Sequence, residues 1–297
     1  MANIIAVIWD CDKTLIDGYM QDPIFKEFNM DGHKFWKEMD EVVAELEKSG
    51  KRINKDTYYL NHFIHCAQDG TFPGLDNQML RDFGKMQKFY PGVPEIFEKT
   101  KMICDDQSYS EYGIKVEHYI VSTGFAEVIR GSVLAEHMED IWGCELIERE
   151  DCDGNKVIGE AVYTIDNTTK TRAIFEINKG KGIDVNAKIP KELRRVQFEN
   201  MIYIADGPSD IPAFSLVKQN GGSTFAIYPK GDIQAMQQVE NMRQNGRVDM
   251  YAEADYSEET TAFMWISNAI KEKADKIRDR EKNKILNSVS CVPKHLT

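Results

Sequence analysis

The sequence predicts an α/β protein in which a mainly parallel sheet forms the core and a small helical unit is inserted after the first strand. Short apolar runs at residues 4–9, 116–121 and 201–205 are each followed by acidic or hydroxyl side chains. Such runs are typical of strands buried on both faces of a parallel sheet. Residues 17–90 instead carry apolar side chains spaced three and four apart, which indicates helices. A chain of 297 residues is long enough for a core with an inserted subdomain.

Composition argues against several classes of partner. The net charge of −12 and the pI near 5.1 disfavour nonspecific binding to nucleic acid or to anionic membranes, because both need an excess of Lys and Arg. No apolar run approaches the roughly 18 residues that span a bilayer, and no signal-like segment opens the chain. We therefore expect a soluble cytoplasmic protein. Its cysteines are expected to be reduced thiols, because no Cys-x-x-Cys pair occurs. The cysteines are Cys11, Cys66, Cys104, Cys144, Cys152 and Cys291.

The inserted unit is expected to form helices throughout. Apolar and aromatic side chains recur at helical spacing between residues 25 and 46, a second helix is expected at 55–67, and a third from about 76 to 89. A Pro-Gly-x-Pro cluster at residues 91–94 then marks the return to the core. The sequence thus predicts a helical cap at 17–90 and a core made of 1–16 and 91–297.

The remaining elements alternate between strands and helices. A β-hairpin is expected near 144–165, because strand-like runs flank an Asp-Gly turn that contains Asp153. A calcium loop at Asp153 is disfavoured because the helix-loop-helix spacing is absent. The other expected elements are a helix at 94–104, a loop at 105–113, a helix from about 125, a helix that begins at 167–169, a strand at 224–228 and a charged helix with a solvated face at 271–284.

Reactive side chains follow three of the apolar runs. Asp10 and Asp12 follow the first, Ser122 the second, and Asp206 with Asp210 the third. The carboxyl ends of parallel strands face a common crevice, so these groups are expected to converge. Carboxylates crowded in this way repel each other, and binding a cation or acting on a phosphate would account for their presence.

A lysine in the first turn of a helix adds to this pattern. Lys170 stands where the helix dipole disfavours a cation, so a phosphate held between Lys170 and the acids would account for it. The alternatives are that Lys170 is an ordinary surface lysine, or that Lys179 or Lys181 fills this place.

These residues, taken in order, resemble the four motifs of the haloacid dehalogenase superfamily. The motifs are Asp10-Cys11-Asp12-Lys13-Thr14, Val121-Ser122-Thr123-Gly124, Lys170, and Asp206-Gly207-Pro208-Ser209-Asp210. The layout is most similar to the phosphoserine-phosphatase-like branch, because a helical insert follows the first motif and only a hairpin-sized segment separates the second from the third. The resemblance covers about residues 4–265. It implies a doubly wound, Rossmann-like sheet and a phosphoryl-transfer enzyme.

The resemblance also implies a role for each matched residue. Asp10 would be the nucleophile that forms an aspartyl-phosphate, and Asp12 the general acid and then the base. The implied Mg²⁺ would be held by Asp10, Asp206 and the backbone carbonyl of Asp12, while Asp210 would support the metal or hold Lys170. The implied phosphate-binding residues are Ser122, Thr123, Gly124 and Lys170, with Thr14 bracing the first loop.

The first and fourth motifs decide between chemistries and show where this chain departs from the pattern. A phosphatase must protonate an alkoxide leaving group, whereas a dehalogenase need not protonate a halide, so Asp12 favours phosphoester hydrolysis. Lys13 stands where a small residue is more usual, and Pro208-Ser209 lies inside the fourth motif. Lys13 is expected to point outward or toward the insert.

Substrate choice is expected to come from the insert. Tyr58, Tyr59, His62 and His65 could line a pocket, although a packed helix explains each of them at least as well, and zinc at the two histidines lacks a third ligand. A basic face formed by Arg81, Lys85 and Lys88 could receive an anion or could simply be solvated.

The predicted function is a Mg²⁺-dependent phosphatase acting on a small phosphorylated metabolite through an aspartyl-phosphate. A phosphotransferase or mutase that uses the same intermediate is the alternative, and a non-catalytic binding protein is a third reading. The substrate and the oligomeric state do not follow from the sequence.

Overall fold

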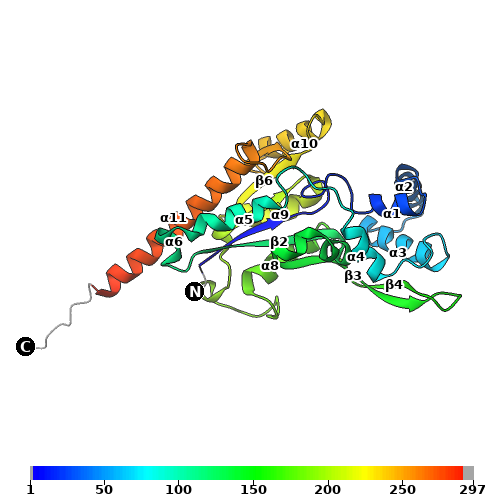
Figure 1. Cartoon of the computed structure of the whole chain (residues 1–297), viewed down its shortest axis with the longest axis horizontal. Helices are drawn as coiled ribbons and strands as arrows, with labels where there is room; N and C mark the ends of the chain where they lie inside the picture. Colours follow the sequence, from blue (N-terminus) through cyan, green and yellow to red (C-terminus); the bar gives the residue numbers. More distant parts are fainter. Residues whose placement is uncertain (1–2, 290–297) are drawn as a thin grey trace, which may run out of the picture.

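A seven-stranded sheet forms the centre of the computed structural model, which describes residues 3–289 (Figure 1). The strand order is β4-β3-β2-β1-β5-β6-β7, and every neighbouring pair is parallel except β3 with β4. This confirms the expected doubly wound, mainly parallel sheet. The strands are β1 (Ile4–Trp9), β2 (Lys115–Phe125), β3 (Met138–Glu150), β4 (Lys156–Tyr163), β5 (Met201–Ala205), β6 (Ser223–Tyr228) and β7 (Met250–Glu253).

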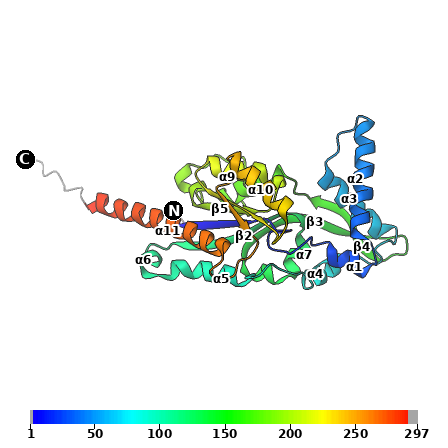
Figure 2. The same cartoon turned by 90° about the horizontal axis from the view of Figure 1, so that it is seen from above.

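Helices cover both faces of this sheet (Figure 2). Strand β1 lies between β2 and β5, and all six of its residues are buried. The Trp9 ring meets Phe97 edge-on at 5.7 Å and Tyr256 at 5.5 Å, which joins β1 to α5 and to the segment that precedes α11. One face carries α5 (Glu95–Lys101), α7 (Ala126–Gly131) and α11 (Thr261–Val289), and the other carries α8 (Thr169–Lys179), α9 (Ile211–Gln219) and α10 (Ile233–Gln244).

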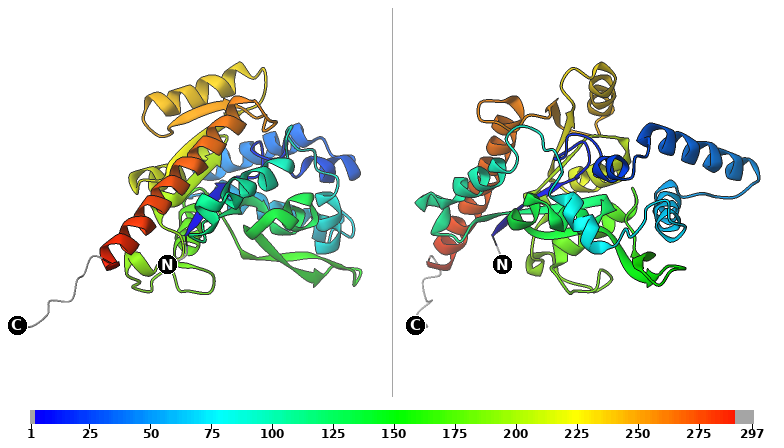
Figure 3. Two further views of the ribbon diagram at one scale, coloured as in Figure 1. Left: turned by 60° about the vertical axis from the view of Figure 1, so that its left-hand side comes forward. Right: turned by 45° about the vertical axis from the view of Figure 1, so that its right-hand side comes forward.

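The inserted helices lie at one end of the long axis, away from the far end of α11 (Figures 1 and 3). Aromatic side chains pack among them, for example Phe25 against Phe35 at 4.9 Å and against Phe63 at 5.6 Å. These aromatic residues belong to the apolar positions whose helical spacing predicted the insert. The helices are α1 (Asp22–Glu27), α2 (Gly32–Lys48), α3 (Lys55–Gln68) and α4 (Asn77–Gly84).

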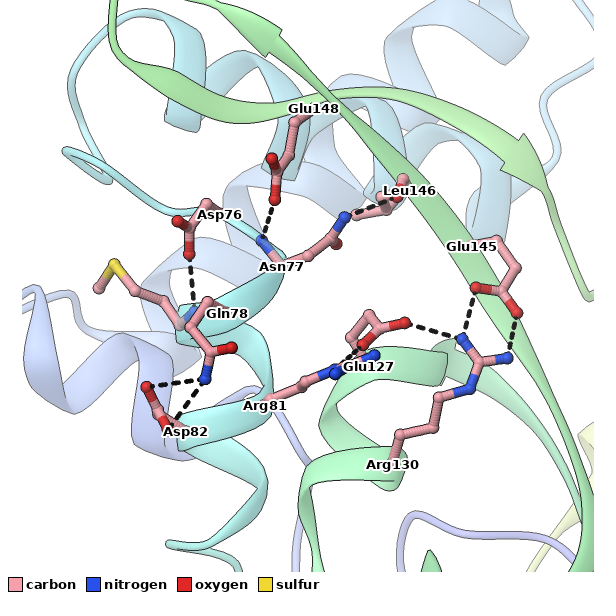
Figure 4. Close-up of polar contacts among 11 residues, drawn as sticks. Asp76, Asn77, Gln78, Arg81, Asp82, Glu127, Arg130, Glu145, Leu146 and Glu148 are labelled. Carbon is pink, nitrogen blue, oxygen red and sulfur yellow. Dashed lines mark hydrogen bonds and ion pairs between the residues drawn. The ribbon is translucent and has the colours of Figure 1, made fainter.

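Helix α4 is attached directly to the core (Figure 4). Arg81 forms an ion pair with Glu127 of α7, and Arg130 of α7 contacts Glu127 at 2.8 Å and Glu145 of β3 at 2.5 Å. The two helix backbones touch, since a Cβ at Gly84 would lie 2.2 Å from the carbonyl oxygen of Val128. The last part of the segment 17–90 is therefore continuous with the core, and the cap boundary at 17–90 stays a prediction.

Several elements differ from their expected bounds. The helix expected at 76–89 ends at Gly84, because the chain turns back to the first loop, where the Tyr90 N–H donates to the Leu15 carbonyl at 3.0 Å. Strand β3 is much longer than its hairpin part, since its first half pairs with β2 and its second half with β4. The expected loop at 105–113 contains α6 (Gln107–Ser110), and β7 was not anticipated.

The charged segment 271–284 is only partly solvated. It belongs to α11, and Lys273, Ala274 and Ile277 are buried. The expected solvated face is present on one side of this segment, and the other side of α11 packs on the core.

The expected free thiols are found in the described part of the chain. Four of them are buried and Cys152 is exposed, while Cys291 lies outside the described residues. Among residues 3–289, no helix has the length and apolar character to cross a membrane.

Candidate active site

The register of the central strands brings the predicted motifs to one edge of the sheet. Trp9 pairs with Ile120 of β2 and with Ile204 of β5. The Asp10 N–H continues this pairing by donating to the Ile204 carbonyl at 2.9 Å. Ser122 and Asp206 each stand two residues beyond those paired positions, so three strand ends deliver their polar side chains to the same place.

Lys170 lies between two of the acids. Its Nζ donates to Asp10 Oδ1 at 2.8 Å and to Asp210 Oδ1 at 2.6 Å, and the lysine is only 1% exposed. The carboxylate of Asp166 accepts hydrogen bonds from the Thr168 and Thr169 N–H groups at 2.9 and 2.7 Å, which fixes the start of α8. Lys170 thus reaches the acids from the first turn of α8.

The two alternative lysines lie elsewhere. Lys179 Nζ donates to the Ala187 carbonyl at 2.7 Å, and Lys181 pairs with Asp140 at 3.0 Å. Neither is in contact with Asp10 or Asp210, so the geometry favours Lys170 over both of them.

Asp210 is held by two further donors. The Tyr203 hydroxyl donates to Asp210 Oδ1 at 2.5 Å and Ser209 Oγ donates to Oδ2 at 2.9 Å. Both Tyr203 and Asp210 are fully buried. Sequence reasoning missed Tyr203, although a phenol inside a buried strand that ends in an acidic motif needs a polar partner.

The first motif forms a tight loop with distinct partners for each side chain. Asp12 Oδ1 accepts the Met20 N–H at 2.8 Å, and Thr14 Oγ1 lies 3.4 Å from Asp10 Oδ2. Lys13 adopts a left-handed backbone with φ of 53°, and its Nζ lies 4.3 Å from the centre of the Tyr19 ring. Lys13 therefore turns toward the insert, in agreement with the expectation.

The second motif lies under Met20. Ser122 is buried, and its Oγ accepts the Gly124 N–H at 3.0 Å. A Cβ at Gly124 would lie 2.3 Å from Met20 Sδ, so only glycine allows this approach. Thr123 and Gly124 belong to β2, and α7 begins two residues later at Ala126. The amides of this loop thus stand at a strand end just before α7 rather than in its first turn.

Burial raises the pKa of three carboxyl groups at this edge, those of Asp10, Asp12 and Asp206. The pKa of Asp10 rises to about 6, because burial and the charge of Asp210 outweigh the attraction of Lys170. Burial and Asp10 raise the pKa of Asp206 to about 7 and that of Asp12 to about 8. The pKa of Lys170 is raised by Asp10 and Asp210 in spite of its burial. Asp12 is therefore suited to carry a proton at neutral pH.

The donor set fits a hard divalent cation. Oxygen atoms of Asp10, Asp206 and Asp210 all lie within 4.8 Å of one another. The raised pKa values of Asp10 and Asp206 reflect burial and mutual repulsion, and a cation would relieve that repulsion. Both oxygens of Asp210 already accept hydrogen bonds, which leaves Asp206 and the second oxygen of Asp10 the freer ligands. The Asp12 carboxylate is not part of this group, and its predicted contribution is the backbone carbonyl.

Comparison with solved structures agrees with this arrangement. A hydrolase of the haloacid dehalogenase family from Salmonella enterica serovar Typhi superposes with a TM-score of 0.52 and 15% identity, over 84% of this chain and 67% of that one. The chain has the haloacid dehalogenase fold. A phosphoserine phosphatase in its apo form shares this haloacid dehalogenase fold with a TM-score of 0.50 and 16% identity, over 83% of this chain and 92% of that one.

A sequence relative is known as well. An uncharacterized protein of Borreliella burgdorferi is 36% identical over 282 residues, which covers 90% of this chain and 97% of that protein. The two chains belong to one family within the haloacid dehalogenase fold. No protein-family model matches the chain.

The candidate specificity residues are spread over the insert. Tyr59 is buried against the core, with its ring 5.7 Å from Phe125. His62 stacks on Phe35 at 4.9 Å, Tyr58 on His62 at 6.3 Å, and His65 lies 3.6 Å from Asp69 on the surface. Among the described residues, the two histidines join no group of potential metal ligands.

The expected basic face is largely paired. Arg81 contacts Glu127, and Lys85 contacts Asp82 at 2.6 Å, while Lys88 is exposed. Because Arg81 is used to attach α4 to α7, its contacts do not favour an anion site at this face.

Proposed function

We propose that the protein is a cytoplasmic, Mg²⁺-dependent phosphatase that hydrolyses a small phosphomonoester through an aspartyl-phosphate on Asp10. One observation carries the proposal: Asp10, at the end of the central strand, lies 2.8 Å from Lys170 Nζ and within a cluster that also contains Asp206 and Asp210. A buried carboxylate beside a lysine and further acids is the arrangement that phosphoryl transfer by a nucleophilic aspartate requires.

In the first step, an oxygen of Asp10 forms a bond to phosphorus while the bond from phosphorus to the alcohol oxygen breaks. Asp12 gives its proton to that leaving oxygen, so the alcohol departs neutral. The raised pKa of Asp12, about 8, supports this role because the group carries its proton at neutral pH.

In the second step, Asp12 accepts a proton from a water molecule that attacks phosphorus. The bond between phosphorus and the Asp10 oxygen breaks, which releases inorganic phosphate and restores the Asp10 carboxylate. Asp12 then holds its proton again for the next cycle.

The remaining residues bind and orient the phosphoryl group. Lys170, held in place by Asp210, and Ser122 with the loop through Gly124 are the donors for phosphoryl oxygens. A Mg²⁺ held by Asp10 and Asp206 would supply the positive charge that offsets repulsion between the anionic nucleophile and an anionic substrate.

The proposal is tested with a panel of phosphate esters assayed with Mg²⁺ and then with EDTA. We expect phosphate release only with Mg²⁺, and none from the Asp10→Asn variant. Hydrolysis that persists in Asp10→Asn, or after complete removal of metal, would contradict the mechanism. Phosphate loss that occurs only when a second alcohol acceptor is present would identify a phosphotransferase instead.

The role of Asp12 is tested by comparing leaving groups. The Asp12→Asn variant should lose about 100- to 10,000-fold in kcat/KM on an alkyl phosphate, because the alkoxide then departs without a proton. The comparison uses kcat/KM because this parameter reports the step in which the leaving group departs, and not the later hydrolysis in which Asp12 acts as the base. The loss should be much smaller on p-nitrophenyl phosphate, whose leaving group is stable as an anion. Equal losses on both esters would show that Asp12 is not the general acid.

A further inference from the structure

A buried polar pair joins the insert to the core beside the candidate active site. Gln21 is 3% exposed, and its Nε2 donates to the Tyr59 hydroxyl at 2.8 Å. Within the described part of the chain, the Gln21 Oε1 has no hydrogen-bond partner. If the amide is turned over, its oxygen accepts the Tyr59 O–H and its nitrogen becomes the unpaired atom; a hydroxyl group, which both donates and accepts, partners either orientation, whereas an amino donor partners only the orientation with a free oxygen. A buried polar atom without a partner is uncommon in a folded protein, and a ligand is one explanation for it.

The position of this pair relates it to Asp12. Gln21 directly follows Met20, whose N–H holds Asp12 Oδ1 at 2.8 Å. The Tyr59 ring packs on Phe125, next to the Gly124 of the second motif. Burial raises the pKa of the Tyr59 phenol, and the charges of Cys144, Asp12 and Asp56 raise it further. The pair therefore lies on the side of Asp12 that faces the insert.

Asp56 adds an acceptor to the same region. It stands in the first turn of α3, is half-buried, and has a raised pKa caused by burial and by the charge of Asp166. Because the Tyr59 oxygen accepts from Gln21, the phenol proton remains available to a further acceptor. The region offers acceptors at Gln21 and Asp56 and one donor at Tyr59.

The proposed reaction places the alcohol of the substrate here. Asp12 protonates the leaving oxygen, so atoms attached to that oxygen extend from Asp12 toward its insert side. Gln21 and Tyr59 are buried, as Ser122 and Lys170 are, so the substrate reaches all four only when the insert moves away from the core.

We propose that Gln21 and Tyr59 bind the alcohol part of the substrate, and that they select phosphomonoesters whose alcohol carries a hydrogen-bond donor, a hydroxyl or an amino group, close to the ester oxygen. This inference rests on the proposed phosphatase function. A donor on the alcohol gives the unpaired Gln21 oxygen its missing partner. An alkyl alcohol leaves that oxygen unpaired in a closed site, which is unfavourable.

The test uses three esters of similar size: ethyl phosphate, 2-hydroxyethyl phosphate and 2-aminoethyl phosphate. For the wild-type enzyme with Mg²⁺, kcat/KM for at least one of the two donor-bearing esters should exceed that for ethyl phosphate about 10- to 100-fold. The Gln21→Met and Tyr59→Phe variants should reduce this preference to within about threefold, chiefly by lowering kcat/KM for the donor-bearing esters. Whether the hydroxyl or the amino ester is preferred identifies the donor.

Gln197→Met is the matched control. Gln197 is also 3% exposed, but its Nε2 donates to the Lys191 and Arg194 carbonyls, away from the site. This variant should keep the wild-type preference. Circular dichroism and thermal melting establish that each variant is folded, and Tyr59→Phe decides the matter if Gln21→Met does not fold.

The outcomes distinguish failure of the proposed alcohol selection from failure of the proposed phosphatase function. Hydrolysis of all three esters at similar rates, or a preference that survives in both variants, would overturn the inference alone. Loss of ethyl phosphate hydrolysis in folded variants would overturn it too, because the pair would then support the chemistry rather than the choice of alcohol. A wild-type enzyme that hydrolyses neither these esters nor p-nitrophenyl phosphate would overturn the phosphatase function, and this inference with it.

Discussion

Asp10 and Asp12 stand two residues apart and yet acquire different partners. Asp10 faces Lys170 in the core, whereas Asp12 is held by a backbone N–H of the segment that leads into the insert. Burial raises the pKa of both groups, but the charge of Lys170 holds that of Asp10 to about 6, whereas the charge of Asp10 helps to raise that of Asp12 to about 8 although the Met20 N–H lowers it. A nucleophile that ionises and an acid that keeps its proton can thus come from one short loop.

Tyr203 illustrates a residue that acts through others. It donates to the same Asp210 oxygen that Lys170 contacts. We expect Tyr203→Phe to lower kcat about tenfold with little change in KM, because loss of one buried hydrogen bond loosens Asp210 and the lysine that depends on it. Steady-state kinetics on any ester that the enzyme hydrolyses provide the measurement.

Tyr119→Phe serves as the control for that experiment. The Tyr119 hydroxyl is equally buried and lies in the same sheet, but it donates to Glu117 and contacts Arg195 outside the site. An unchanged kcat in Tyr203→Phe, or the same loss in both variants, would refute the positioning role of Tyr203.

At the scale of elements, helix starts link the insert to the catalytic helix. The Asn54 Oδ1 caps α3 by accepting the Thr57 N–H at 2.9 Å, and its Nδ2 donates to Asp166 at 2.8 Å. Asp166 in turn caps α8, which carries Lys170. The first turns of α3 and α8 are therefore joined through two side chains.

Helix α11 docks on the core through a buried lysine. Lys273 is 4% exposed, its Nζ donates to the Glu199 carbonyl at 2.8 Å, and burial lowers its pKa to about 8. The folded state thus releases this proton at a lower pH than the unfolded state does, so the penalty for burying the charge is fully present below about pH 8 and is relieved as the pH rises.

The Lys273→Met variant tests this docking. Because methionine cannot titrate, the free energy of unfolding of the wild type relative to the variant should rise by up to about 3 kcal/mol between about pH 7 and about pH 10.5. Denaturant titrations at the two pH values measure it. A difference that stays constant with pH would contradict the lowered pKa of Lys273.

At the scale of the whole molecule, we expect the acids of the candidate site to make stability depend on pH and on metal binding. Without metal, the raised pKa values of Asp10, Asp12 and Asp206 mean that the folded state keeps protons that the unfolded chain has released above about pH 4. Stability of the metal-free protein should fall as the pH rises from that point through the folded-state pKa values of about 6 to about 8.

Mg²⁺ should reverse this loss by binding the ionised carboxylates. We expect Mg²⁺ to raise the melting temperature more at about pH 8 than at about pH 5, because protons compete with the metal at the lower pH. Thermal melts with Mg²⁺ and with EDTA at both pH values measure the effect, and Asp206→Asn should diminish it. Equal shifts at both pH values, or an undiminished shift in Asp206→Asn, would speak against metal binding at this cluster.

The sequence by itself determined the strands whose ends carry the candidate site residues, and the order of the polar groups at those ends. The apolar runs at 4–9 and 201–205 are strands, and parallel strands in one sheet necessarily present Asp10, Ser122 and Asp206 at one edge. Lys170 was also recognisable, since its place in the first turn of a helix conflicts with the local dipole. These features depend on residues close together in the chain, so they can be predicted from this sequence alone.

The tertiary structure alone decided which distant side chains meet. The contact of Tyr203 with Asp210 depends on how the loop after β5 folds back, and the pairing of Gln21 with Tyr59 depends on how two helices of the insert pack. The double pairing of β3 likewise depends on both its neighbours. A hydrogen-bond partner is set by packing across the whole chain, and residues far apart in sequence carry no local signal of it.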